Sequence, residues 1–168
     1  MNKSENRYFE IQPEMAKRPD FSEILPYFGT KQQITIEKKC GSSIKAEGKC
    51  FEFQPESEIR HDFLEIFPYI GEKQKITYET KEFSAVCPFS GLPDIAYIKI
   101  EYIPDKSCLE LKSLKYYFVS YRNVGIYQEA VTNRVFKDIK NMLQPKYLKI
   151  TTIYNTRGGI DATCEIET

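Results

Sequence analysis

The chain has 168 residues and a mass of 19.7 kDa, which suits one domain or one domain with an extension. Its 24 lysine and arginine residues balance 24 aspartate and glutamate residues, and this zero net charge argues against a nucleic-acid surface that works by bulk charge. No apolar run approaches the roughly 20 residues of a membrane span, and the polar N-terminus lacks the apolar core of a signal peptide. We therefore expect a cytoplasmic protein without a membrane partner.

Cysteine and histidine usage argues against a structural metal or a disulfide framework. The five cysteines are odd in number, widely spread and form no Cys-x-x-Cys pair. The single histidine, His61, cannot supply the several nitrogen ligands that zinc sites usually recruit. We expect no metal.

An internal repeat occupies the first half of the chain. Residues 8–37 align with residues 50–79 at an offset of 42, with identity at 18 of 30 positions. The similarity fades before Cys87, whose equivalent in the first copy is Lys45. Two copies are too few for a solenoid, so we assign residues 1–49 to an N-terminal accessory segment and residues 50–168 to the folded domain. For the first copy an extra edge strand, a partner contact and a loosely ordered remnant of duplication are all open.

Hydrophobic periodicity predicts strands on either side of two helices. Short β-like runs are expected at 33–39 and 75–80, and an alternating strand with one buried face precedes Pro104. The inward residues of that strand are Ala96, Ile98, Ile100 and Tyr102. Two further strands are expected at 147–154 and 160–167, joined by a turn at 156–159.

Between these strands the period changes to that of a helix. A first helix from Glu110 should bury Leu111, Leu114, Phe118 and Tyr121 and end at Asn123-x-Gly125. A second, stopped by Pro145, should bury Ala130, Val131, Val135, Ile139 and Met142. The order strand, strand, helix, helix, strand, strand predicts an α+β fold, an antiparallel sheet with both helices on one face. Its bare sheet edges favour oligomers.

A cysteine and an aspartate flank a tight loop that could carry chemistry. Pro88 biases Cys87 away from helix, and Gly91 and Pro93 force a turn that can bring Asp94 back toward the sulfur. A thiolate nucleophile needs a nearby proton acceptor or positive group, and the aspartate could exchange a proton with a substrate. Taken alone, the pattern also describes a buried cysteine with a turn-capping aspartate, and for the bare pattern this structural interpretation is favoured.

Other charged groups have similar double interpretations. Glu110, Lys112 and Lys115 could meet an anionic ligand, or form a solvated helix face with a favourable first-turn acid. Arg157 before two glycines could bind phosphate, or belong to an ordinary hairpin. Glu129 near the start of the second helix is usually an exposed first-turn acid.

Taken together and in order, five separated motifs resemble the NADPH-dependent 7-cyano-7-deazaguanine reductases, the QueF family of queuosine biosynthesis. The resemblance covers about residue 63 to the C-terminus and excludes residues 1–49. The motifs are Glu82–Pro88 with Gly91-x-Pro93-Asp94, Glu110-Leu-Lys-Ser-x-Lys-Tyr, Ser120-Tyr-Arg-Asn, Gln128-Glu129 and Arg157-Gly-Gly-Ile-Asp.

This resemblance implies a fold and an assembly. The family has the tunnelling fold (T-fold), a four-stranded antiparallel sheet with two helices. Strands of neighbouring subunits complete a barrel, and the rings stack face to face. The chain is therefore expected to be a homo-oligomer with active sites between subunits, and a monomer should be inactive.

The resemblance also implies a reaction. Cys87 attacks the nitrile carbon of 7-cyano-7-deazaguanine to give a thioimide, and Asp94 protonates the nitrile nitrogen. Two hydride transfers from two molecules of the cofactor NADPH then yield the aminomethyl product. The partner is thus a small-molecule substrate, with no direct nucleic-acid contact.

Binding residues carry over in the same way. The substrate-binding positions are Leu109, Glu110, Leu111, Gln128 and Glu129, of which the glutamates face the guanine-like donor edge. The cofactor-binding positions are Leu111, Lys112, Arg157 and Gly158. The positive charges of Lys112 and Arg157 suit the extra phosphate of NADPH. Many family members carry histidine where this chain has Gln128; glutamine can hydrogen-bond a substrate but cannot shuttle a proton.

Three other functions are weighed against the reductase. An archaeosine-type amidinotransferase uses the same Cys/Asp pair on tRNA, but it lacks the Glu-Leu-Lys-Ser-x-Lys run, and the neutral charge gives little support for tRNA binding. Cyclohydrolases of the same fold need zinc ligands, which the single histidine hardly supplies. A non-catalytic purine-binding protein would retain the glutamates without needing Cys87.

Overall fold

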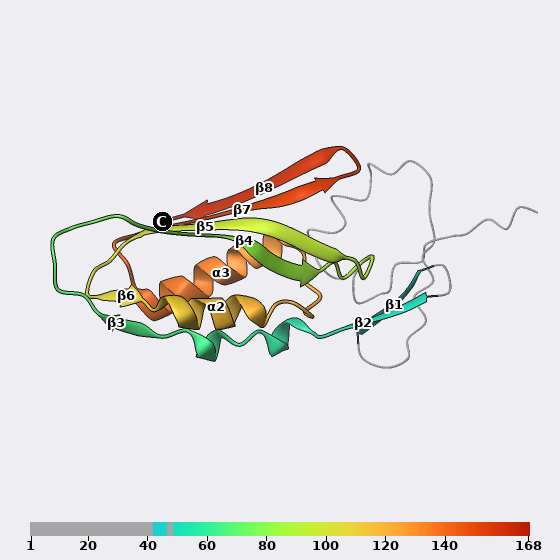
Figure 1. Ribbon diagram of the computed structural model, residues 1–168, viewed down its shortest axis with the longest axis horizontal. Coiled ribbons are helices and arrows are strands. Elements are labelled where there is room, and N and C mark those ends of the chain that lie inside the picture. The colour runs from blue at the N-terminus through green and yellow to red at the C-terminus, as the bar shows by residue number, and fades with distance from the viewer. Residues whose placement is uncertain (1–41, 47–48) are drawn as a thin grey trace, which may run out of the picture.

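The computed structural model describes residues 42–46 and 49–168, and its centre is a four-stranded antiparallel sheet. The strands lie in the order β4-β5-β7-β8, and helices α2 and α3 cover one face (Figure 1). The bounds are β4 (Ile76–Val86), β5 (Pro93–Ile103), β7 (Tyr147–Arg157), β8 (Ile160–Glu167), α2 (Leu111–Val119) and α3 (Gln128–Leu143). The predicted α+β fold class is confirmed.

Shorter elements lie around this unit. They are the hairpin β1 (Ser42–Ala46) with β2 (Lys49–Phe53), the pair β3 (Ile66–Pro68) with β6 (Ser107–Leu109), and the 3-10 turns η2 (Glu56–Glu58) and η3 (His61–Phe63). The domain boundary expected at residue 49 falls at the first residue of β2. The run expected at 33–39 lies outside the described residues. No helix in the described part of the chain is long and apolar enough to cross a membrane.

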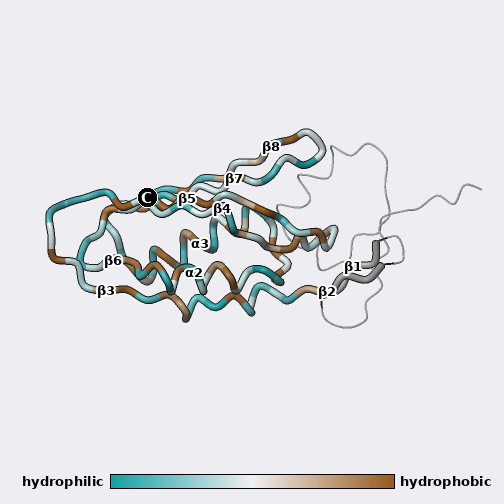
Figure 2. Tube along the Cα trace, viewed as in Figure 1, coloured by the Kyte–Doolittle hydropathy of each residue, from teal (hydrophilic) through white to brown (hydrophobic). Residues whose placement is uncertain are grey.

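The core lies between the sheet and the helices. In β5 the residues expected to face inward, from Ala96 to Tyr102, are at most 1% exposed, whereas the intervening residues reach the other face. Figure 2 shows the apolar residues recurring along these strands and helices, while the loop between β3 and β4 is largely hydrophilic. Burial on one face thus follows from the period of two in the sequence.

Three expectations for the helices are corrected. Leu111 is 59% exposed, because α2 begins there and Glu110 is its N-cap. The helix ends at Val119, before Asn123, and the chain continues in tighter i to i+3 turns that still bury Tyr121. In α3 Met142 is exposed and Leu143 is buried instead, so the inward stripe ends one residue later than its spacing indicated.

Two of the expected strands are longer than the sequence indicated. β4 runs on to Val86, and β7 extends to Arg157, leaving only Gly158 and Gly159 between it and β8. Both glycines have positive φ, 57° and 81°, which a two-residue antiparallel turn requires. Within the described chain the outer sides of β4 and β8 carry no strand, apart from a single bridge between Val86 and Gly125.

A buried polar network joins the two helices. The Tyr117 hydroxyl donates to Asp138 Oδ2 at 2.8 Å and lies 2.6 Å from the Tyr121 hydroxyl. Asp138 Oδ2 also accepts from Arg134 Nε at 2.7 Å. Both tyrosines are fully buried, so each hydroxyl needs its partner.

We predict that Tyr117→Phe lowers the free energy of unfolding by about 1–3 kcal/mol, because it leaves buried polar groups without their partner. Urea unfolding at one fixed protein concentration measures this. The adjacent Tyr116 is 52% exposed, so Tyr116→Phe serves as the matched control with a change within about 0.5 kcal/mol. Equal unfolding midpoints for the two variants would contradict a stabilising network.

Candidate active site

The loop between β4 and β5 holds Cys87 as the first residue after a strand. The Cys87 N–H donates to the Leu92 carbonyl and the Gly91 N–H donates to the Cys87 carbonyl, both at 2.8 Å. Gly91 has a φ of 68°, which lets the chain turn back within this short loop. The tight loop predicted from the sequence is present, and Cys87 is a half-buried free thiol.

Asp94 lies on the neighbouring strand and faces the core. It pairs with Ala85 in the register of β4 and β5, two residues before Cys87 along the chain. Paired residues share a face, so Asp94 lies on the same side of the sheet as Ala85 and Ala96. Only 3% of Asp94 is exposed. The structure thus brings the cysteine loop and a buried carboxyl group to one end of the sheet.

Two side chains from other elements reach the Asp94 carboxyl group. Arg157 Nη2, at the end of β7, forms an ion pair with Asp94 Oδ1 and donates to the Pro93 carbonyl at 3.0 Å. Gln128 Nε2, in the first turn of α3, donates to Asp94 Oδ1 at 3.3 Å. Position 128 therefore holds a donor to the aspartate.

The pKa of Asp94 is raised above the ordinary carboxyl value. Burial raises this pKa most, and the charge of Glu129 raises it further. The charge of Arg157 and the hydrogen bonds from Gln128 and Arg157 lower it. A carboxyl group with a raised pKa can keep a proton to donate, so the environment suits a general acid.

Glu129 lies close to this cluster, although it is exposed. Burial is the main cause of the raised pKa of both Tyr154 and Cys164, and the charge of Glu129 adds to each. The Tyr154 hydroxyl donates to the Gln128 carbonyl at 3.3 Å, which ties the start of α3 to β7. Glu129, the next residue, thus lies where its charge acts on Asp94.

Glu110 acts as the N-cap of α2. Its two carboxylate oxygens accept from the backbone N–H groups of Lys112 at 2.9 Å and Ser113 at 2.6 Å. These hydrogen bonds lower the pKa of Glu110. The first turn of α2 itself carries no acidic residue, so the acid expected in that turn is the N-cap instead.

The side chain of Leu109 is buried, and its backbone N–H and carbonyl groups both form hydrogen bonds. None of it is exposed, its N–H donates to the Tyr102 hydroxyl, and its carbonyl accepts from the Tyr78 hydroxyl, both at 3.2 Å. It positions the start of α2 beside β4.

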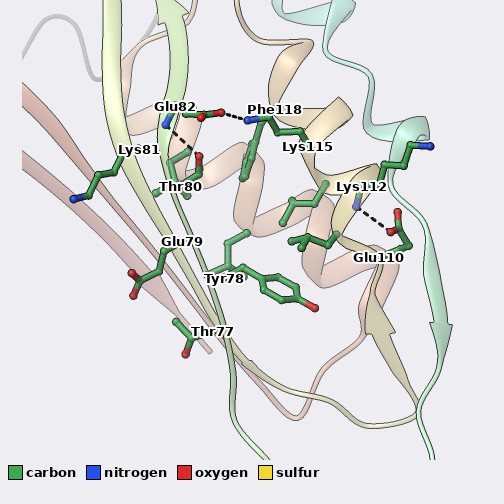
Figure 3. A pocket seen from close by; sticks show the side chains of 14 residues that line it. Thr77, Tyr78, Glu79, Thr80, Lys81, Glu82, Glu110, Lys112, Lys115 and Phe118 are labelled. Atoms are coloured by element: carbon green, nitrogen blue, oxygen red, sulfur yellow. Dashed lines mark hydrogen bonds and ion pairs between the residues drawn. The ribbon is translucent and has the colours of Figure 1, made fainter.

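A groove of about 910 Å³ lies between α2 and β4 (Figure 3). Apolar side chains line its floor, and Glu110, Lys112 and Lys115 come from the helix. Lys115 Nζ forms an ion pair with Glu82, whereas Glu79 and Lys81 point away from the helix (Figure 3). The floor residues include Ile98, Ile100, Leu114 and Phe118.

The predicted site residues therefore form two separate groups within one chain. The first is the acid cluster, made of Cys87, Asp94, Gln128, Glu129 and Arg157. The second is the groove, with Glu110, Leu111 and Lys112. The Tyr78 hydroxyl donates to the carbonyl of Leu109, the residue before Glu110, and Tyr78 lies nine residues before Cys87. At about 3.3 Å per residue, the strand between Tyr78 and Cys87 spans roughly 25–30 Å, so Glu110 and Cys87 lie near its opposite ends.

Two features of these groups were missed in the sequence. The contact between Arg157 and Asp94 joins residues 63 apart, and no local pattern signals it. The ion pair between Glu82 and Lys115 lies in two of the recognised motifs, but neither residue had been given a partner. In the described part of the chain no three His, Cys, Asp or Glu side chains gather as a metal site.

Known proteins are similar to this chain over nearly its whole length. The family model described as "QueF-like protein" matches residues 93–168. The NADPH-dependent 7-cyano-7-deazaguanine reductases of Thermotoga petrophila and Thermotoga maritima are each 56% identical over 167 residues, 99% of this chain and 91% of theirs. That alignment includes the N-terminal repeat. The reductase of Chlorobaculum tepidum is 51% identical over 85 residues, 51% of this chain and 73% of its own.

A solved structure has the same fold. The apo archaeosine synthase QueF-Like superposes with a TM-score of 0.52 at 23% identity, over 60% of this chain and 96% of that one. At this identity the likeness concerns the fold alone, and it supports the T-fold arrangement. The reductase relatives decide the family, and they confirm the resemblance carried by the five motifs: the chain belongs to the NADPH-dependent 7-cyano-7-deazaguanine reductases.

Proposed function

We propose that this chain reduces the nitrile of 7-cyano-7-deazaguanine to 7-aminomethyl-7-deazaguanine with NADPH, a step of queuosine biosynthesis for tRNA modification. The observation that carries the proposal is the buried Asp94 beside the Cys87 loop, in a chain 56% identical to two such reductases. A nitrile is a poor hydride acceptor, and a nucleophile next to a proton donor removes that obstacle.

In this mechanism the first step is covalent. The sulfur of Cys87 bonds to the nitrile carbon, one π bond of the triple bond opens, and its electrons take a proton from Asp94. The product is a thioimide with a polarised C=N bond, and Asp94 is left as a carboxylate. The NADPH cofactor supplies hydride in two successive transfers. The raised pKa of Asp94 favours its role as the donor.

Substrate recognition falls to the carboxylates. Glu129 at the mouth of the acid cluster, and Glu110 of a second chain, would accept from the donor edge of the deazaguanine. A site that pairs those donors rejects bases without them strongly. Gln128 would contact the substrate or orient Asp94, and as an amide it takes no part in proton transfer.

The groove has properties that suit a dinucleotide. Its volume lies within the usual range of ligand sites, its floor is apolar, and the lysines of α2 stand at its rim. We assign Leu111 and Lys112 of one chain to the cofactor, together with Arg157 and Gly158 of a neighbouring chain.

The separation of the two groups supports the proposal of a homo-oligomer. One small substrate cannot reach Glu110 and Cys87 of the same chain across roughly 25–30 Å. The open outer sides of β4 and β8 can pair with neighbouring chains, so that strands continue into a barrel and rings stack. The active site then lies between subunits. We place the protein in the cytoplasm, where thiols such as Cys87 stay reduced.

We keep residues 1–49 as an accessory segment. In the second copy of the repeat, described from residue 52 onward, Ile59 and Leu64 are the buried side chains. Their equivalents in the first copy are Lys17 and Ser22, which cannot anchor in the same apolar core. This difference supports keeping the first copy apart from the domain of residues 50–168.

The reaction is tested by incubating the protein with 7-cyano-7-deazaguanine and NADPH. We expect two NADPH oxidised per product and none with Cys87→Ala. Cys164→Ala, which removes the second half-buried thiol among the described residues, is the control and should keep its turnover. No oxidation by a correctly assembled wild type that binds the nitrile would overturn the reductase assignment.

For Asp94→Asn we expect a loss of turnover of about 10²-fold or more with little change in substrate binding, because general acid catalysis contributes about 10²–10⁴-fold. Steady-state kinetics together with isothermal titration separates the two effects. Turnover equal to that of the wild type removes Asp94 from the mechanism.

Glu110 is tested through pH. Its lowered folded-state pKa means that it contributes stability above its unfolded pKa, which is lost as pH falls through the folded value. Glu110→Gln should therefore be less stable than the wild type at pH 7, and the gap should close well below about pH 4. Urea unfolding at several pH values measures this, with exposed Glu72→Gln as control. A gap that persists at low pH contradicts a charged cap.

A further inference from the structure

Arg157 makes two contacts at once with the strand that carries the catalytic acid. Its Nη2 pairs with Asp94 Oδ1 and donates to the carbonyl of Pro93, the residue before it, at 3.0 Å. Asp94 is 3% exposed, whereas the Arg157 side chain is 42% exposed. The guanidinium thus closes the acid cluster from its solvent side.

The charges around Asp94 are few, and they oppose one another. In the described chain Arg157 faces it from β7 and Glu129 faces it from the first turn of α3. The neutral Gln128 amide and the buried Tyr154 phenol complete its surroundings. Arg157 favours the carboxylate, while burial and Glu129 favour the protonated acid.

The same guanidinium is the group that our proposed function assigns to the cofactor phosphate. Phosphate and carboxylate groups both accept hydrogen bonds from the planar guanidinium of arginine. An arginine that binds a phosphate is therefore no longer available to a carboxylate. Arg157 is followed by Gly158 and Gly159, and a Cβ added to either glycine would meet nothing within 4 Å. The turn that follows Arg157 is thus open, and the half-exposed guanidinium is accessible to an anionic ligand.

We propose that Arg157 is a positioning residue that holds Asp94 as a carboxylate, and that a bound NADPH phosphate draws the guanidinium away and so releases the acid. This inference rests on the proposed function of the site. Cofactor binding would thereby change the protonation states of Cys87 and Asp94.

The proton balance gives the direction of the effect. Thioimide formation requires Asp94 with its proton and Cys87 without one, and the proton that Asp94 gives to the nitrile nitrogen is the one that it has taken from the Cys87 thiol, so Asp94 ends as a carboxylate. No electron acceptor or donor enters this step. A guanidinium paired with Asp94 lowers the population of that protonation state, so its removal accelerates bond formation.

The experiment measures adduct formation without hydride transfer. Wild type and Arg157→Gln are mixed with 7-cyano-7-deazaguanine in the absence of NADPH, quenched at intervals, and the mass of the covalent adduct is followed across pH. An opposite charge lowers a carboxyl pKa by about 1–3 units, and the exposure of Arg157 places the effect near the lower end. We expect the acid-side midpoint to rise by about one pH unit and the rate at neutral pH to rise about tenfold.

A second arm adds NADP⁺, which binds but cannot donate hydride. The wild-type profile should then move toward that of Arg157→Gln, while the variant stays where it is. Arg157→Lys, which keeps the charge without the planar fork, should lie between the two. Arg60→Gln is the matched control, since it removes an exposed arginine–aspartate pair remote from the site.

The outcomes separate this inference from the function itself. If wild type forms no adduct under any condition, the proposed nucleophile and acid fail. If wild type forms the adduct and Arg157→Gln has the same midpoint, or a lower one, the coupling alone is overturned. A variant profile that shifts while NADP⁺ leaves the wild type unchanged overturns the link to the cofactor.

Discussion

The burial of one carboxyl group is the constraint on which this active site depends. Asp94 continues the inward stripe of β5, where every neighbouring inward residue is apolar. A carboxylate placed there needs compensation or a proton. The structure supplies an arginine and an amide from elements far along the chain, and leaves the pKa raised nonetheless. A carboxyl group with a raised pKa is better suited to donate a proton to a nitrile than an ordinary one.

The fold itself could be predicted well from local pattern. The period of two in β5 and the apolar stripes of the helices led to the correct sheet and the correct covered face. Errors occurred where end effects override periodicity. Leu111 fits the stripe by spacing, yet as the first residue of a capped helix it lies outside the core. Met142 and Leu143 were exchanged because the last turn of α3 reaches the core one residue later.

The site could be predicted only in its parts. Cys87, Asp94 and the Gln128-Glu129 pair were recognised from their motifs, and the structure gathers them at one end of the sheet. What the sequence does not encode locally is the partner of each charge. Arg157 meets the acid because β7 pairs with β5, and Glu110 is separated from the cysteine by the length of β4. Both facts depend on sheet topology, which lies beyond any local spacing.

These observations lead to one central claim, that each catalytic site is built from two chains. It is tested most directly by mixing Cys87→Ala with Glu110→Gln under conditions that exchange subunits. Neither variant alone has the complete set of groups. If a site takes Cys87 from one chain and Glu110 from another, random mixing restores both to about a quarter of the sites, with activity to match. Mixed oligomers that stay as inactive as their parents would contradict a shared site.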